Sequence, residues 1–202
     1  MEFPELLRRR RNVRHYTRDA VDRETLERVV ATVRRAPSAG YSQGQRLIVV
    51  TDRSLLDELA AIEQDDAPEG VEPWFGSAAA HIVVLTREDD YHDRYRKQDK
   101  LADGEEIEWP VPFWFVDAGA ALMLILLAAI DEGLAAGVYG VIGEDEPRLR
   151  ALLKIPPDLS IVAGVTLGKP APDPEWSKLA SRATQRRRPL DELVRWEQWD
   201  ST

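Results

Sequence analysis

The feature that most constrains this chain is an apolar run from Ala118 to Ile130, bracketed by Asp117 and Asp131. The run is too short to span a bilayer, and it favours a buried core helix within residues 113–134. Its apolar residues occupy every side of that helix, and a helix that is hydrophobic all round must be covered all round. The cover can come from within one subunit or from a second copy of the chain. Because 202 residues offer little other cover, we expect an obligate homodimer with this helix at its centre.

Apolar periodicity elsewhere predicts helices and strands that alternate around one sheet. Helices are expected at 2–11, with Leu6 and Leu7 inward, from an N-cap at Asp22 to before Pro37, at 54–62 and at 148–153. Buried strands are expected at 47–50, 78–85, 138–142 and 160–167. This order predicts an α/β or α+β fold in one domain over 1–202. A polar stretch at about 87–112 is interpreted as a mobile lid with a short helix, and the tail at about 171–202 as a segment that wraps over a partner.

Composition excludes several classes of function. The formal net charge of −9 and the pI near 5.0 disfavour general nucleic-acid binding despite the arginine clusters. The absence of cysteine excludes disulfides, thiolate metal sites and cysteine nucleophiles, and three scattered histidines make a metal site improbable. No signal peptide or membrane span is visible, so we expect a cytoplasmic protein. The sequence also lacks the glycine patterns of Rossmann and P-loop nucleotide sites.

Arginines cluster near both ends of the chain, at 8–14 and at 186–188, with a weaker basic group in the lid. A guanidinium is a planar fork that suits phosphate, so the two clusters suggest one anion held between them. The alternative is a solvated charged face. The clusters alone do not decide between the two.

Five short motifs, in order along nearly the whole chain, resolve this ambiguity. Residues 10–16 (Arg-Arg-Asn-Val-Arg-His-Tyr) resemble the opening signature of the nitroreductase family, and 36–43 (Ala-Pro-Ser-Ala-Gly-Tyr-Ser-Gln) resemble its segment before a strand. The Asp-Ala-Gly-Ala-Ala at 117–121, the glycines at 133 and 140, and the Arg-Arg-Pro at 187–189 are similar to its remaining motifs. Asn12 replaces the usual Ser and can still donate to phosphate. Tyr41 replaces an Asn, so Tyr41 would stack on a substrate, restrict access to the pocket or simply pack in its loop.

The resemblance implies an α+β sandwich with a central mixed sheet flanked by helices, in an intertwined homodimer with FMN at the interface. It implies that Arg10, Asn12 and Arg187, with Arg11 and Arg186 beside them, hold the FMN phosphate, and that Arg14 lies near the pyrimidine ring. Pro37, Ser38, Ala39 and Gln43 would line the flavin from the other subunit. Tyr139 and Gly140 would pack on the ring and offer a backbone N–H near N5. No side-chain acid or base is required, since the flavin performs the redox chemistry.

The activity implied is ping-pong oxidoreduction, in which NAD(P)H reduces FMN and an electron-poor acceptor such as a nitroaromatic or quinone is then reduced. Aromatic and cationic residues of the lid and loop suit an aromatic acceptor with a carboxylate or nitro group: Tyr41, Tyr91, Arg94, Tyr95, Lys100 and Trp109. The alternatives are a flavin-dependent oxidase or dehalogenase, an F420-linked reductase, and a non-catalytic flavin-binding module. His81 is interpreted as structural.

Overall fold

The computed structural model describes residues 1–62, 74–172 and 187–199. The chain divides into two compact units, Met1–Ala171 and Pro172–Thr202. The described part of the second unit contains the short helix α9 (Leu190–Leu193). The first unit holds the helices and strands on which the candidate site depends.

Seven α-helices and two 3-10 turns are described in the first unit: α1 (Phe3–Arg9), α2 (Arg23–Ala31), η1 (Thr32–Arg35), η2 (Ala39–Tyr41), α3 (Arg53–Ile62), α4 (Trp74–Ser77), α5 (Asp89–Tyr95), α6 (Phe113–Asp131) and α7 (Asp145–Leu153). Local sequence explains their ends. Asp22 caps α2, because its side chain accepts a hydrogen bond from the N–H of Thr25. Helix α2 continues into η1, which ends at Arg35, two residues before Pro37, where the sequence predicted a break.

The sheet has four strands in the order β1-β2-β4-β3. These are β1 (Gln45–Val50), β2 (Ala80–Thr86), β3 (Ala135–Tyr139) and β4 (Ser160–Gly168). Every pairing among these strands is antiparallel, so the expectation of a mixed sheet is wrong for the described residues. The fold class itself, α+β, is as expected. The three antiparallel pairings do not join simple hairpins, because α3 and α4 lie between β1 and β2 and α7 lies between β3 and β4 along the chain.

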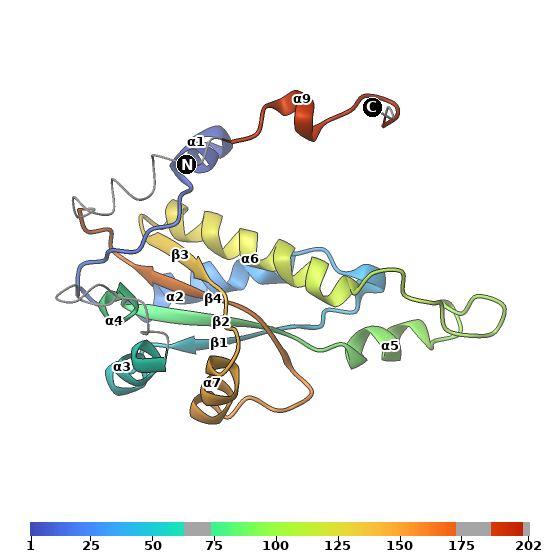
Figure 1. The fold of residues 1–202 in the computed structure, drawn as a ribbon, viewed down its shortest axis with the longest axis horizontal. Helices are drawn as coiled ribbons and strands as arrows, with labels where there is room; N and C mark the ends of the chain where they lie inside the picture. The colour runs from blue at the N-terminus through green and yellow to red at the C-terminus, as the bar shows by residue number, and fades with distance from the viewer. Residues whose placement is uncertain (63–73, 173–186, 200–202) are drawn as a thin grey trace. The chain divides into compact units, whose positions relative to one another are not determined.

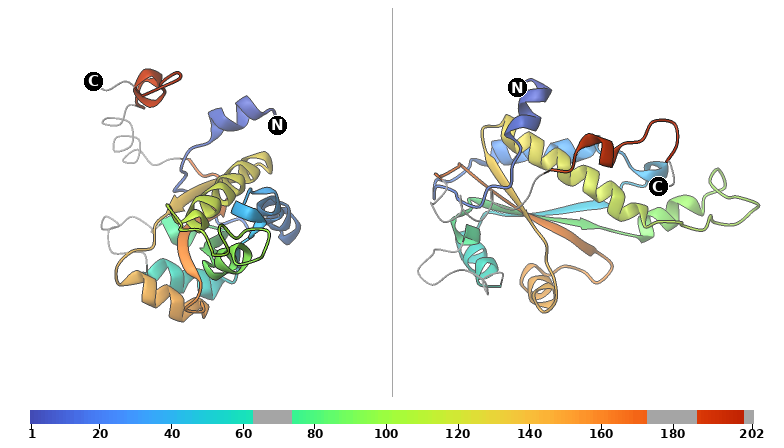
Figure 2. Two further views of the ribbon diagram at one scale, coloured as in Figure 1. Left: turned by 90° about the vertical axis from the view of Figure 1, so that its right-hand side faces the viewer. Right: turned by 45° about the horizontal axis from the view of Figure 1, so that its top comes forward.

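Helices cover the two faces of the sheet with separate cores (Figures 1 and 2). On one face, Val29 of α2 and Ile125 of α6 pack with Ile82 and Val84 of β2. On the other face, Leu59 of α3 and Leu149 of α7 pack with Val83 and Leu85. Alternate residues of β2 thus point to opposite cores, and the whole strand is buried. The result is a helix–sheet–helix sandwich.

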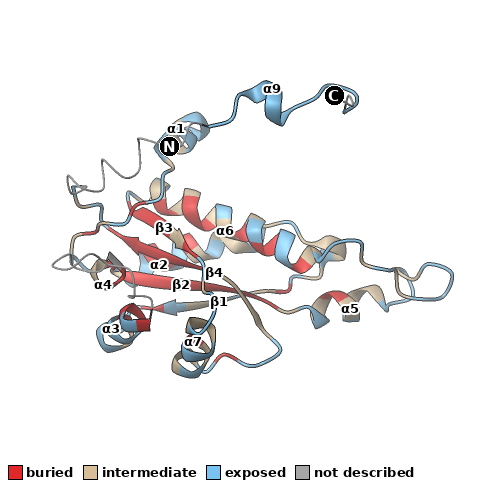
Figure 3. Cartoon of the chain, viewed as in Figure 1, coloured by how far each residue is buried: buried red, intermediate tan, exposed pale blue. Residues whose placement is uncertain are grey.

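The outer face of α6 stays uncovered within one chain (Figure 3). Ala118, Ala121 and Ile125 are fully buried, whereas Val116 is 56% exposed and Met123 is 44% exposed. By length and composition alone the helix could cross a membrane, yet it packs on the sheet as the central core helix. An apolar stripe of α6 is therefore left exposed by the described residues of one chain.

Three expectations about elements are wrong in detail. The strand expected at 47–50 is not buried, because β1 is the sheet edge and only Val50 is inaccessible. The third strand begins three residues earlier than expected, at Ala135, directly after the turn that ends α6. Helix α1 buries no residue, and Leu7 points outward at 48% exposure.

Candidate functional site

The arginine-rich segment after α1 lies along the outer edge of β3. The N–H of Val13 donates to the carbonyl oxygen of Ala136 at 2.9 Å, and the N–H of Val138 donates to Oδ1 of Asn12 at 3.4 Å. Val13 is buried, while its neighbours Asn12 and Arg14 are exposed. An extended segment fixed in this way presents its polar side chains to solvent in a defined order.

Tyr16 fastens this segment to the sheet. Its buried hydroxyl lies 2.6 Å from the carbonyl oxygen of Val13 and 2.7 Å from Oγ1 of Thr166 on β4. Burial raises the pKa of the Tyr16 hydroxyl, so it remains a donor. Gly137 permits the close approach, because a Cβ there would lie 2.3 Å from the Val13 carbonyl oxygen.

Two arginine environments in this region differ. Arg8 and Arg9 form ion pairs with Glu5 on α1. The half-buried side chain of Arg10 has no hydrogen bond or ion pair within the described ranges 1–62, 74–172 and 187–199. A partly desolvated guanidinium without a partner favours an anionic ligand.

The loop from Pro37 to Gly44 is held in an unusual conformation. Gly40, Tyr41 and Gln43 all have positive φ, at 59°, 62° and 54°. Such values are uncommon for residues with a side chain and cost about 1–3 kcal/mol when forced. Within the loop, the N–H of Gln43 donates to Oγ of Ser38 at 3.0 Å. Tyr41 is left 77% exposed.

Residues 87–112, interpreted from the sequence as a lid, contain a cluster of aromatic side chains around Trp109. Trp109 packs edge-on against Tyr95 at 4.5 Å and against Trp114 at 5.9 Å between ring centroids. Its indole N–H donates to Glu106 at 2.9 Å, and Glu106 also accepts from His92 and Arg96. These donors lower the pKa of Glu106, and Glu106 in turn raises the pKa of His92.

Within one chain, α6 separates the two halves of the expected site (Figure 1). The Asn12 segment borders β3, which follows the carboxyl end of α6, whereas the Ala39 N–H donates to Asp117 near its amino end at 2.8 Å. Nineteen helical residues span about 28 Å. The arginine segment and the 37–44 loop of a single chain therefore lie at opposite ends of α6.

Comparison with known proteins bears on this arrangement. The sequence model of the nitroreductase family, described as "Nitroreductase family", matches residues 7–169. The chain belongs to the nitroreductase family.

Named relatives of this family extend over most of the chain. A 4-nitrobenzoate reductase of Nocardioides sp. is 27% identical over 230 residues, covering 98% of this chain and 90% of the relative. An FMN reductase (NAD(P)H) of Bacillus subtilis is 26% identical over 168 residues, covering 80% and 63%. The solved structure of an FMN-dependent nitroreductase of Clostridium difficile superposes with a TM-score of 0.66 at 20% identity, covering 96% and 98%, which supports the fold.

One residue inferred from the nitroreductase resemblance is placed differently by the structure. Tyr139 is buried, and its ring packs against Phe75 at 4.8 Å between centroids, in the core between the sheet and helices α3 and α7. Its hydroxyl lies 3.0 Å from Nδ1 of His81. The expectation that the Tyr139 side chain packs on the flavin is therefore wrong, because the alternation of β3 turns it inward. Gly140, directly after the strand, is exposed, and its backbone role stays a prediction.

The nitroreductase lid residues also serve other purposes than expected. Tyr91 is fully buried, so its assignment as an acceptor contact is wrong. Arg94 binds Asp99 through two hydrogen bonds and the carbonyl oxygen of Gly40 through a third. Lys100 lies 5.4 Å from the centroid of the Tyr95 ring. Among the predicted acceptor residues, Tyr41 is the most exposed aromatic side chain.

Two of the predicted phosphate residues, Arg186 and Arg187, come from the C-terminal tail. Arg186 lies outside the described residues, and Arg187 belongs to the second unit. The roles of Arg10, Arg11 and Asn12 at the phosphate, and the placement of Arg14 near the pyrimidine ring, stay predictions. Pro37 and Gln43 are exposed, while Ser38 and Ala39 are half-buried.

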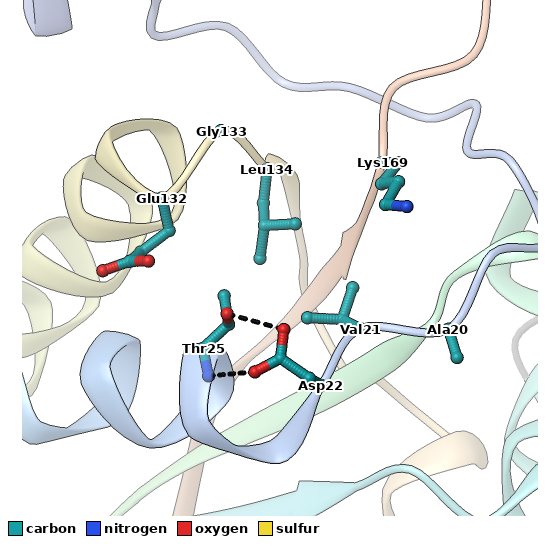
Figure 4. A pocket seen from close by; sticks show the side chains of 8 residues that line it. All are labelled: Ala20, Val21, Asp22, Thr25, Glu132, Gly133, Leu134 and Lys169. Carbon is teal, nitrogen blue, oxygen red and sulfur yellow. Dashed lines mark hydrogen bonds between the residues drawn. The ribbon is translucent and has the colours of Figure 1, made fainter.

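A shallow pocket of about 310 Å³ opens elsewhere, between the start of α2 and the turn after α6 (Figure 4). It is lined by Asp22, Thr25, Glu132 and Lys169 together with four smaller or apolar residues. Asp22 is already engaged by Thr25, and Glu132 by Arg28 at 2.8 Å. Lys169 pairs with Asp19 at 3.6 Å, so each of the four polar side chains of the lining already has a partner among the described residues.

The structural roles of two residues, Asp117 and Glu106, were not predicted, although Asp117 was noted at the start of the apolar run and in a motif. Asp117 is buried and receives hydrogen bonds from Ala39 and Tyr91. A carboxylate next to an apolar helical run must be paired if it is buried, and that was the available signal. Glu106 gave no comparable signal, because it lies in a stretch rich in acidic residues.

Proposed function

We propose that this chain is an FMN-dependent NAD(P)H oxidoreductase that reduces nitroaromatic, quinone or similar electron-poor acceptors. Membership of the nitroreductase family supports oxidoreduction, and the names of relatives support flavin and NAD(P)H. The observation that carries the proposal is the half-buried Arg10 beside the ordered Asn12 segment. Bound FMN would supply hydride chemistry that protein side chains cannot perform.

The donor set of the arginine segment fits a phosphate monoester. Asn12 accepts from Val138 through Oδ1, which leaves its amide NH2 group as a donor toward an anion. Arg10 adds a planar guanidinium, and Arg187 would add a second from the tail. Arg11, Arg14 and Arg186 would add positive charge around the site. The order that Tyr16 imposes on the segment reduces the entropy lost when the phosphate binds.

We further propose a homodimer in which each site draws on both chains. A two-fold axis across the exposed stripe of α6 would set two such helices side by side in opposite directions. The amino end of one α6, with its 37–44 loop, would then approach the arginine segment of the partner. Burying the stripe would remove exposed apolar surface at Val116 and Met123 from water, at roughly 25 cal/mol per Å².

A single titration tests the proposed activity. The protein as purified is mixed with FMN, freed of excess flavin, and its visible spectrum is recorded under nitrogen while NADPH or NADH is added. We expect a yellow protein with one FMN per subunit that bleaches on addition of the nucleotide and regains its colour with 4-nitrobenzoate or a quinone. Failure to retain flavin would contradict the proposal. Colour loss with a reduced metabolite but not with either nucleotide would favour an oxidase instead.

A further inference from the structure

The lid helix α5 holds the 39–44 loop at both of its ends. At one end, the Ala39 N–H and the Tyr91 hydroxyl both donate to the same atom, Oδ2 of Asp117, each at 2.8 Å. At the other end, the Tyr91 ring packs against Gly44, and the N–H of Arg87, just before α5, donates to the Gly44 carbonyl oxygen at 2.9 Å. Tyr91 thus meets one end of the loop through the carboxylate of Asp117 and the other end through its ring.

Contacts from α5 also fix the middle of the loop. Nε of Arg94 donates to the Gly40 carbonyl oxygen at 2.9 Å. The Tyr95 ring lies so near Gly40 that a Cβ there would approach it to 2.7 Å, and the Tyr91 ring does the same at Gly44, at 2.5 Å. The glycines are needed for this close packing, and at Gly40 also for the positive φ.

The conformation that these contacts impose displays one aromatic side chain. Tyr41 has φ 62° and is 77% exposed. A positive φ is unfavourable for tyrosine, and the exposed side chain gains no burial from this conformation. The surrounding contacts must therefore hold the backbone of Tyr41 in it. By contrast, Tyr91 is fully buried, and Tyr95 packs with Trp109.

We propose that Tyr41 is the specificity-determining residue for aromatic acceptors, and that Tyr91 and Asp117 are positioning residues that act through it. This inference rests on the proposed function, because it needs a flavin beside the loop. The Tyr41 ring would stack on the acceptor, which favours electron-poor aromatic rings over small non-aromatic oxidants. The lid then sets specificity by shaping the loop and does not contact the acceptor through Tyr91.

The test is a double-mutant cycle of Tyr41→Ala and Tyr91→Phe on the flavin-loaded protein, with Asp89→Asn as the matched control on α5. Asp89 is an exposed residue of the same helix. The KM for 4-nitrobenzoate should rise roughly three- to tenfold in either single variant, as expected for loss of one stacking or hydrogen-bonding contact. Turnover of ferricyanide and the rate of flavin reduction by NADPH should stay within about twofold.

The double variant decides whether Tyr91 acts through Tyr41. If it does, Tyr41→Ala/Tyr91→Phe has the same KM as Tyr41→Ala alone, because no positioned ring remains to be disturbed. Additive effects, no effect, or an equal loss with ferricyanide would each overturn the proposal. Asp117→Asn, which keeps the shape of the side chain, should act in the same direction and serves if Tyr91→Phe does not fold.

A second readout needs neither acceptor nor nucleotide. Amide hydrogen exchange of the 36–46 segment, followed by mass spectrometry, should be roughly tenfold faster in Tyr91→Phe than in the parent and unchanged in Asp89→Asn. Unchanged exchange in Tyr91→Phe overturns the anchoring. A parent protein that binds no flavin would refute the proposed function, and with it the assignment of Tyr41, while the exchange result would still decide whether Tyr91 anchors the loop.

Discussion

The imidazole of His81 bridges two groups of the core between the sheet and helices α3 and α7. Its Nδ1 lies 3.0 Å from the Tyr139 hydroxyl, and its Nε2 lies 3.0 Å from the Phe75 carbonyl oxygen. A carbonyl oxygen only accepts, so Nε2 carries the proton and Nδ1 accepts from the hydroxyl. The ring is neutral at pH 7, because burial lowers its pKa to about 4.

This histidine should make the fold sensitive to acid. Unfolded His81 titrates near 6.5, so the unfolded chain binds an additional proton below that pH and the folded chain does not until about pH 4. The contribution of neutral His81 to the free energy of unfolding is full above pH 6.5 and falls by up to about 3 kcal/mol as the pH drops to 4. Urea unfolding from pH 4 to 7.5 measures this, and His81→Gln should flatten the profile. His92→Gln is the control, because the raised pKa of His92 predicts the opposite slope.

Tyr139→Phe separates a core role from a flavin-stacking role. The phenyl ring keeps the packing but leaves Nδ1 of His81 without its donor, which should cost about 1–3 kcal/mol of unfolding free energy. FMN affinity should change less than about twofold, since the hydroxyl faces the core. The measurements are urea unfolding and quenching of FMN fluorescence. A large loss of FMN affinity without a loss of stability would argue against the inward placement.

Arg10→Ala should weaken FMN binding far more than Arg8→Ala. Loss of a charge-assisted contact to phosphate is worth about 1.5–3 kcal/mol, or roughly 10- to 100-fold in Kd. Arg8 is the matched control, because it is an exposed residue of α1 that pairs with Glu5. Riboflavin, which lacks the phosphate, should bind both variants equally. Equal losses of FMN affinity in the two variants would mean that the phosphate lies elsewhere.

Met123→Glu should break the proposed dimer. The charge would lie in the exposed apolar stripe of α6, where a buried unpaired carboxylate costs several kcal/mol. Light scattering should then give the 22.8 kDa monomer mass, and bound FMN should be lost with it. Ala151→Glu, on the exposed face of α7, is the control and should leave the mass unchanged. A monomeric parent protein would contradict the dimer proposal directly.

Helical periodicity predicted most elements well, because it reports local burial. The cap at Asp22, the break at Pro37 and the apolar helix after Asp117 all follow from short-range chemistry. The edge position of β1 could not be predicted, since an apolar run such as 47–50 fits either a central or an edge strand. The direction of strand pairing was missed for a related reason: it depends on connections between distant segments.

Contiguous motifs located two segments whose cofactor roles stay predictions, whereas the direction of two tyrosine side chains was mistaken. The Arg10–Asn12 segment and the 37–43 loop are compact motifs, and the structure gives each an ordered backbone. Tyr91 and Tyr139 were assigned to ligands because they are aromatic and lie in the right segments, yet both point into the protein. Tyrosine suits a core and a binding site equally well. Only the helix face that α5 turns toward the core, and the alternation of side chains along β3, decide which role each tyrosine takes.

The separation of the arginine segment from the 37–44 loop by the length of α6 has a genetic consequence. In the proposed dimer, each site takes its arginine segment from one chain and its 37–44 loop from the other. A homodimer with a damaged loop therefore loses the loop half of both sites, and a homodimer without Arg10 loses the arginine half of both sites. Mixing the two inactive variants would place both lesions in one centre and leave the other centre whole. Co-expressed, the two defective chains should therefore complement each other and recover part of the parental turnover, as two identical lesions cannot.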